Sequence, residues 1–319
     1  MIVRYSLNNM CPCDSGRQIK NCPNRCFRRD GSLRPRQAQT PTTLPSTGYS
    51  HARCYAAPLN DCSTRISGEH TLSDSVLREL SPTGIVEVSG LGDKRADEFL
   101  SIPIAGFRSN VLCERHNFAL SPLDAIGHRF FKSFRTLNAE LRDKTKKPRN
   151  RGYLFNGHDI ERYILKILCG DGFANKMQGA EGRIRDWRPS AQWIRILYGL
   201  ESFPIGWGLY LSSALGKDIA LDQNSLGVCP VVDGNGDLCG ARFQMFGLEF
   251  ELLMIAPNRT QERYAENCRH RPAEVLFDDG RAVHGILFGW DIKGEAGSLT
   301  IACGVTDNTR ELLSEKARL

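Results

Sequence analysis

The feature that most constrains this chain is the grouping of its cysteines, because seven of the twelve lie between residues 11 and 113. These seven stand in tight spacings beside histidines, whereas the other five are dispersed along the remaining sequence. A disulfide-rich secreted scaffold is usually short, and this chain has 319 residues. In a reducing compartment such spacings indicate zinc ligation. We therefore expect metal-bound segments toward the N-terminus and buried free thiols elsewhere.

Length and composition are typical of a globular protein with two or three domains. Hydrophobic residues make up 41% of the chain and charged residues 24%, which are ordinary values. The longest apolar runs are interrupted by charge and are too short to cross a bilayer. No apolar leader precedes Cys11. We expect a cytoplasmic protein without membrane contact.

Five segments are predicted along the chain. Residues 1–30 form a small Cys-rich knuckle, and residues 31–50, rich in Pro, Thr and Ser, form a flexible linker. Residues 51–141 form a second domain, which ends in a basic linker at 142–152. Residues 153–319 form a third domain in which helical patterns give way to strand patterns. The predicted fold class is α+β.

Local patterns place individual elements. Ser121-Pro122 favours a helix start, and apolar residues recur at helical spacing from there to Leu141. Asp124 and His128 are four residues apart and therefore share one face of this helix. Further helices are predicted at 159–169 and 191–200, and strands at 85–90, at 99–104 and in several runs after residue 226.

The first metal motif reads CPCDSGRQIKNC and spans residues 11–22. Its three cysteines can hold zinc on a small knuckle, with Asp-Ser-Gly supplying a tight turn. The motif resembles the SEC-C zinc knuckle, in which a fourth Cys or His follows at once. Here Pro23 holds that position, and the next cysteine is the obvious substitute. The family uses this knuckle as an attachment module, so it implies a metal site but no reaction. The expected ligands are Cys11, Cys13, Cys22 and Cys26.

A second constellation lies in residues 54–131. It consists of Cys54-x7-Cys62, then Glu69-His70, then Cys113-x-x-His116-Asn117, then Asp124. The pattern resembles the HNH, or His-Me finger, endonucleases over about a quarter of the chain. It departs from the family in its Cys-x-x-His second pair, in the seven residues inside the first pair, and in Ser73, where Pro is common. The resemblance implies a ββα-metal finger of treble-clef type that cleaves nucleic acid.

The resemblance also implies a role for each of these residues. His70 is the general base, and a neutral imidazole suits removal of a proton from water. Glu69 reaches a catalytic cation, and Asn117 braces the loop that orients the base. The family's last cation ligand corresponds to His128, with Asp124 as the runner-up. Magnesium or manganese suits such an oxygen-rich open site.

The remaining donors of the finger form a separate, structural set. Cys54, Cys62, Cys113 and His116 make a closed zinc site that pins the strand ends to the helix. With the knuckle, this gives two zinc ions per chain. A competing assignment makes His70 a zinc ligand in place of Cys54, and it would remove the catalytic base.

Charge points to an anionic partner. Residues 1–150 contain 23 Lys/Arg against 14 Asp/Glu, whereas residues 151–319 contain 19 against 22. A basic half beside a chemical site indicates nucleic acid, with DNA favoured over RNA. The leading hypothesis is a metal-dependent HNH-type endonuclease. The alternatives are a non-catalytic zinc module that binds nucleic acid or a protein partner, with the C-terminal domain as one docking surface, and a regulatory subunit whose C-terminal domain senses a ligand.

Overall fold

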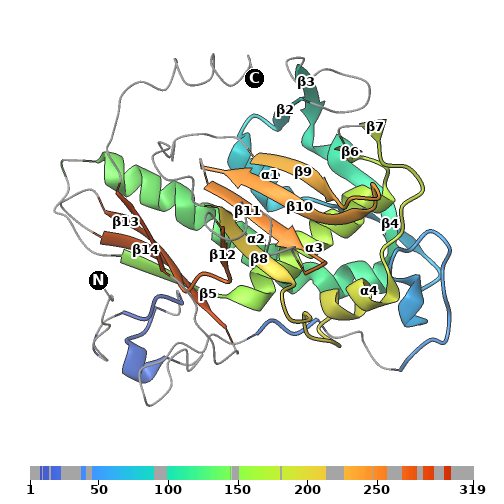
Figure 1. Ribbon diagram of the computed structural model, residues 1–319, viewed down its shortest axis with the longest axis horizontal. Helices are drawn as coiled ribbons and strands as arrows, with labels where there is room; N and C mark the ends of the chain where they lie inside the picture. Colours follow the sequence, from blue (N-terminus) through green and yellow to red (C-terminus); the bar gives the residue numbers. More distant parts are fainter. Residues whose placement is uncertain are drawn as a thin grey trace.

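The computed structural model is a mixed α+β molecule in which two sheets and two long helices share a core (Figure 1). The expected α+β class is confirmed at this level. No helix in the described ranges combines the length and the apolar character needed to cross a bilayer. The structure describes residues 8, 10–13, 16–22, 37–40, 45–89, 99–143, 145, 151–179, 182–212, 226–246, 248–256, 268–278, 283–290 and 298–302.

Residues 54–142, called the finger from here on, contain a pair of antiparallel strands and a long helix. The helix directly follows the second strand. β1 (Ile66–His70) pairs with β4 (Arg108–Cys113), and His70 lies opposite Arg108 in this ladder. α2 (Glu114–Arg142) begins at the residue after β4. The strands predicted at 85–90 and 99–104 are confirmed as an antiparallel pair. The elements between β1 and β4 are α1 (Asp74–Leu80), β2 (Ile85–Ser89), β3 (Phe99–Pro103) and a 3₁₀ turn (Ile104–Phe107).

α2 begins seven residues before Ser121, so the prediction of a helix start at Ser121-Pro122 is wrong. Cys113 has an extended backbone and stands at the N-cap position, and the helix continues through Pro122. Proline lacks the amide hydrogen that would bond to the carbonyl four residues earlier, so the helix tolerates one missing hydrogen bond here. The first turn instead brings Cys113 and His116 together, two donors of a cluster that could hold a metal ion.

A five-stranded antiparallel sheet in the order β12-β8-β11-β10-β9 covers one side of the helices (Figure 1). Its hairpin between β9 and β10 turns at Asp233, whose N–H donates to the Asp237 oxygen at 2.9 Å. The strands are β8 (Gly208–Ser212), β9 (Leu226–Val232), β10 (Leu238–Met245), β11 (Leu248–Leu253) and β12 (Cys268–His270).

A second, four-stranded sheet has the order β15-β13-β14-β5. β5 (Arg151–Asn156) lies parallel to β14 (Val283–Gly289), although the two strands are far apart in sequence. β13 (Glu274–Asp278) is antiparallel to β14 and parallel to β15 (Ser298–Ala302). The strand-rich pattern predicted after residue 226 is therefore confirmed as two sheets. A short pair, β6 (Gln178–Gly179) and β7 (Gly182–Arg183), completes the described strands.

α3 (Gly157–Phe173) is a buried central helix. Fourteen of its 17 residues are buried, and the Asn156 side chain caps its start by accepting from the Asp159 N–H. The helix predicted at 159–169 is confirmed, but polar residues of α3 are buried as well as apolar ones. Each buried charge has a partner, as when Glu161 accepts from Arg271 Nε at 2.8 Å. α4 (Ala191–Leu197) confirms the other predicted helix and packs on α3.

Aromatic side chains of α2 join the finger to both sheets. The Phe134 ring stacks on Phe246 beside β10 and meets Phe277 of β13 edge to face. Phe130 likewise contacts Phe155 of β5 and Phe250 of β11. One hydrophobic core therefore includes residues on both sides of the predicted boundary at 142–152. The domain limits themselves stay predictions.

Part of the predicted linker 31–50 is attached to this core. The Ala38 N–H donates to Asp159 Oδ2 at 2.8 Å, and the Arg162 guanidinium donates to the Ala38 oxygen at 3.1 Å. The buried Thr40 hydroxyl donates to the Tyr198 oxygen. The Asp159 carboxylate and the Arg162 guanidinium of α3 thus bind the N–H and the C=O of Ala38. These contacts attach residues 37–40 to α3.

Candidate functional site

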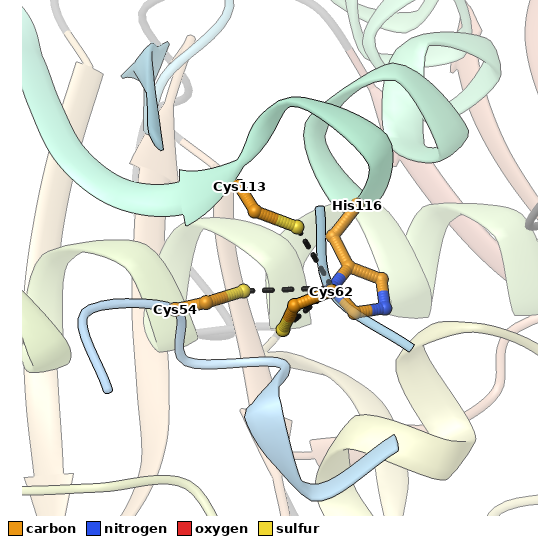
Figure 2. Close-up of side chains that lie close together, drawn as sticks. All are labelled: Cys54, Cys62, Cys113 and His116. Carbon is orange, nitrogen blue, oxygen red and sulfur yellow. Dashed lines mark hydrogen bonds between the residues drawn. The ribbon is translucent and has the colours of Figure 1, made fainter. Parts of the chain in front are cut away.

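The finger brings four buried metal donors together (Figure 2). The sulfur atoms of Cys54, Cys62 and Cys113 lie 3.5, 3.6 and 3.3 Å from Nδ1 of His116. A tetrahedral zinc ion with ordinary bond lengths separates sulfur and nitrogen ligands by about 3.6 Å. The donor types, spacing and burial therefore fit structural zinc. The set contains Cys54 and not His70, contrary to the competing assignment.

Local sequence explains why these donors converge. Cys54 and Cys62 flank a short 3₁₀ turn, Ala57–Leu59, and the Tyr55 N–H between them donates to the Val111 oxygen of β4 at 2.9 Å. Cys113 ends β4, and His116 stands in the first turn of α2. The cysteine loop is thus hydrogen-bonded to the strand that carries the third ligand.

Neighbouring groups support the ligands. The Ser63 N–H donates to the Cys113 sulfur at 3.4 Å. Arg115 binds Asp61 through Nε and Nη2 at 3.0 and 2.9 Å, linking α2 to the Cys62 loop. A hydrogen bond with the Cys54 thiol is the chief cause that lowers the pKa of Cys113 to about 2, and the same contact raises the pKa of Cys54. One sulfur is therefore readily deprotonated, as a metal ligand must be.

The knuckle forms a second cluster of three buried cysteines. Cys11, Cys13 and Cys22 place their sulfur atoms within 4.8 Å of one another. Burial is the chief cause that raises the pKa of the Cys11 thiol to about 12, so this thiol stays protonated unless a cation binds it. The predicted fourth ligand, Cys26, lies outside the described residues. The cluster could hold a metal ion and is compatible with structural zinc.

The knuckle rests on the four-stranded sheet. The Leu154 N–H of β5 donates to the Pro12 oxygen at 2.8 Å. Arg129 of α2 donates to the Cys13 oxygen at 2.9 Å and also to the Leu154 oxygen. The cysteines share a small apolar cluster with Leu154 and Leu287. This cysteine cluster therefore contacts the body of the protein directly.

His70 ends β1 outside both cysteine clusters. Its side chain is 13% exposed, and its Nε2 lies 3.8 Å from Asp74 Oδ1. Among the described residues, Nε2 has no hydrogen-bond partner. Burial lowers the pKa of His70; Asp74 and a hydrogen bond to the backbone of Ile104 raise it, while Arg108 lowers it. The imidazole is therefore neutral at pH 7 and held in position, with one nitrogen left uncommitted.

Glu69 faces the opposite side of β1, into the core. Its carboxylate forms an ion pair with Lys166 of α3, with 2.5 Å between Oε1 and Nζ. Asp124 of α2 pairs with the same ammonium group at 2.6 Å and also accepts from the Ser73 hydroxyl. Burial, with a smaller contribution from Asp124, raises the pKa of Glu69 by more than Lys166 lowers it. The structure thus brings Glu69 together with Asp124, the runner-up cation ligand, around a lysine.

The other two predicted residues have separate partners. The Asn117 side chain donates to Ser67 Oγ at 2.8 Å, which ties the start of α2 to β1. His128 lies 3.4 Å from Glu79 Oε1 on α1. Each of the five candidate catalytic residues therefore lies on or against β1, α1 or α2. Glu69 and Asp124 share a partner, whereas Asn117 and His128 point to different ones.

No family model, curated protein or solved structure matches this chain. The resemblance to HNH and SEC-C motifs therefore rests on the quoted residues. What stands without it is two buried cysteine/histidine clusters that could hold metal ions.

Sequence reasoning missed the contribution of α3 to this region. Lys166 forms ion pairs with Glu69 and Asp124. The Thr71 hydroxyl donates to Asp171 Oδ1 at 2.6 Å. Side chains of α3 therefore bind the residues on both sides of His70. One signal was present in the sequence. Lys166 stands alone in the apolar run Ile164–Cys169, and a lysine buried in such a run requires a carboxylate partner.

Proposed function

We propose that this chain is a nucleic-acid phosphodiesterase of HNH type in which His70 is the general base. The observation that carries the proposal is that the metal set of the finger has four donors without His70. A neutral imidazole with an uncommitted Nε2 can accept a proton from an attacking water. The order β1, β4, α2 around the set is the order that the resemblance implies.

The chain's own residues define the chemistry at this strand end. His70 accepts the proton from water at Nε2, while the Ile104 backbone holds the ring. Arg108, exposed and opposite His70 in the ladder, is placed to bind a phosphate oxygen. Asn117 positions α2 against β1 through Ser67. Nucleic acid is the proposed substrate because of the basic N-terminal half.

Zinc in the finger has a structural part in this proposal. Four protein donors close the coordination shell, so no position is open for water or substrate. Bound zinc would fix Cys113 and His116, and with them the register of β4 against β1. The magnesium or manganese ion expected from the resemblance does not fit the carboxylates assigned to it, because Glu69 and Asp124 already hold Lys166. No step is assigned to such an ion.

The same lysine favours a second candidate function, a non-catalytic zinc module that binds nucleic acid. With Glu69 and Asp124 neutralised, the finger retains a basic surface and a folded scaffold but lacks the family's cation. In that case His70 and Arg108 would contact phosphate without cleaving it.

A comparison of three variants tests the proposal. Zinc-loaded wild type should cleave plasmid DNA or structured RNA, and His70→Ala should reduce the rate by about 10²–10⁴-fold with both zinc ions retained. His51→Ala, a histidine of the same finger outside the metal set, is the matched control and should cleave normally. Cys113→Ala should lose both its zinc ion and its folded structure. Wild type that binds nucleic acid but cleaves neither substrate with magnesium, manganese or no added metal would favour the second candidate.

A further inference from the structure

We propose that Lys166 is a built-in cation that closes the Glu69–Asp124 pair to divalent metal ions. The ammonium group lies between the two carboxylates, 2.5 Å from Glu69 Oε1 and 2.6 Å from Asp124 Oδ1. It also donates to the backbone oxygen of His70 at 3.1 Å. Two carboxylate oxygens and a carbonyl oxygen are the ligand types that magnesium would use. Here all three are bound to one nitrogen.

Lys166 is held by two hydrogen bonds and an ion pair. Its ammonium group donates to Asp124 Oδ1 and to the His70 carbonyl, and it pairs with the Glu69 carboxylate at 2.5 Å. The side chains of Lys166 and Glu69 are 1% and 3% exposed, so water does not compete for these contacts. Burial alone would lower the pKa of Lys166, but the two carboxylates raise this pKa by a larger amount. The pKa of Lys166 therefore lies above its ordinary value. The lysine is therefore charged at pH 7.

Displacing this lysine would be unfavourable. A divalent ion that entered the pair would leave a buried ammonium group without its carboxylates, which carries a large penalty. Asp124 is further held by the Ser73 hydroxyl, and Ser73 in turn contacts the Tyr163 hydroxyl at 3.3 Å. Lys166 and Tyr163 both belong to α3, whose burial leaves little freedom for either to move.

The inference deepens the proposed function and rests on it for one consequence. If His70 cleaves nucleic acid, Lys166 acts as a positioning residue for the end of β1, and no divalent ion occupies the Glu69–Asp124 pair during the reaction. The charge on the scissile phosphate must then be met from the other face of the strand, where Arg108 lies.

Manganese binding to the zinc-loaded full-length protein tests the inference without any nucleic acid. Mn²⁺ titration followed by electron paramagnetic resonance should detect no ion at this pair in wild type. Lys166→Met should gain one Mn²⁺, and adding Asp124→Asn to it should remove that ion. Lys176→Met is the matched control, since this lysine donates to the Phe107 oxygen instead, and it should gain none.

Two results of the manganese titration would overturn the inference. One is Mn²⁺ binding by wild type that is lost in the Glu69→Gln or the Asp124→Asn variant. This comparison does not depend on whether Lys166→Met folds. The other is a folded Lys166→Met protein that binds no Mn²⁺. Magnesium-dependent cleavage lost in Asp124→Asn would also refute the inference while supporting the proposed function. Absence of cleavage would refute only the proposed function.

Discussion

Tyr198 donates a hydrogen bond from its hydroxyl to the backbone oxygen of His116, 3.1 Å away. The two rings also meet edge to face, with centroids 5.3 Å apart. Tyr198 ends α4, in the part of the chain predicted as a separate domain. A residue 82 positions along the chain thus braces the histidine of the finger's metal set.

Removing this hydroxyl should weaken folding modestly without releasing metal. Tyr198→Phe keeps the ring contact but loses one buried hydrogen bond, so the free energy of unfolding should fall by about 1 kcal/mol. Urea denaturation of zinc-loaded protein measures the change. Tyr153→Phe, whose hydroxyl accepts an exposed hydrogen bond from Arg151 at 3.4 Å, should show almost no change. Loss of zinc from Tyr198→Phe would contradict the prediction.

Two zinc ions per chain are expected, one for each cysteine cluster. Cys113→Ser should lose the finger's ion and unfold that region, because metal binding supplies much of the stability of such a site. Cys22→Ser should lose the knuckle's ion alone. Elemental analysis of each purified variant gives the count. Cys239→Ser, a buried cysteine outside both clusters, should retain both ions; a loss there would show that the clusters are misassigned.

Cleavage should persist into mildly acidic solution. The pKa of His70 is lowered mainly by burial, so the acid limb of kcat/KM should lie below the ordinary value of about 6.5. As the pH falls, the unfolded chain takes up the proton before the folded one. The stability contributed by neutral His70 is therefore lost as pH falls from about 6.5 through the folded-state pKa. If the acid limb of the kcat/KM profile instead lies above pH 6.5 and does not change in His70→Gln, the titrating group is not His70.

Much of the fold was predictable because its signals are local. Helical periodicity identified α3 and α4, and strand-forming runs between turn residues identified β2, β3 and most strands after residue 226. The Cys and His motif of the finger identified four residues that lie together in the structure. The pairing of charges was not predictable, because it depends on contacts between distant residues. Lys166 was visible as an isolated charge, but nothing in the sequence connects it to Glu69, 97 residues earlier. The helix start was mispredicted because the helix begins after Cys113 and continues through the Ser-Pro signal at Ser121-Pro122.

The buried Glu161–Arg271 pair should contribute more to specifying the fold than any exposed ion pair. Arg271→Met leaves Glu161, which is 0% exposed, without its cation, and should destabilise the protein by about 3–5 kcal/mol. Arg195→Met at the half-exposed pair with Glu201 should cost less than about 1 kcal/mol. Thermal or urea unfolding compares the two variants. Similar small effects would show that Glu161 is adequately held by its other partners, His158 and Leu209.

Nucleic-acid affinity should fall steeply with salt and depend on the basic stretch at 142–151. Each phosphate contact that is removed should reduce the slope of log K against log salt by about 0.9. Replacing Lys146 and Lys147 by Gln in the full chain should therefore lower both affinity and slope. The same charge change at Arg185 and Arg195, in the acidic half, is the control. Equal effects of the two double variants would place binding elsewhere.

The contact between Leu154 and the knuckle affects whether the edge of the four-stranded sheet can pair with a strand of another molecule. β5 is an edge strand of its sheet, and an exposed edge offers free N–H and C=O groups to any other strand. The outward backbone groups of Leu154 are taken by Pro12 and Arg129. The knuckle therefore covers part of this edge, and a molecule in which the knuckle came loose would offer that part to a strand of another molecule, a route to aggregation.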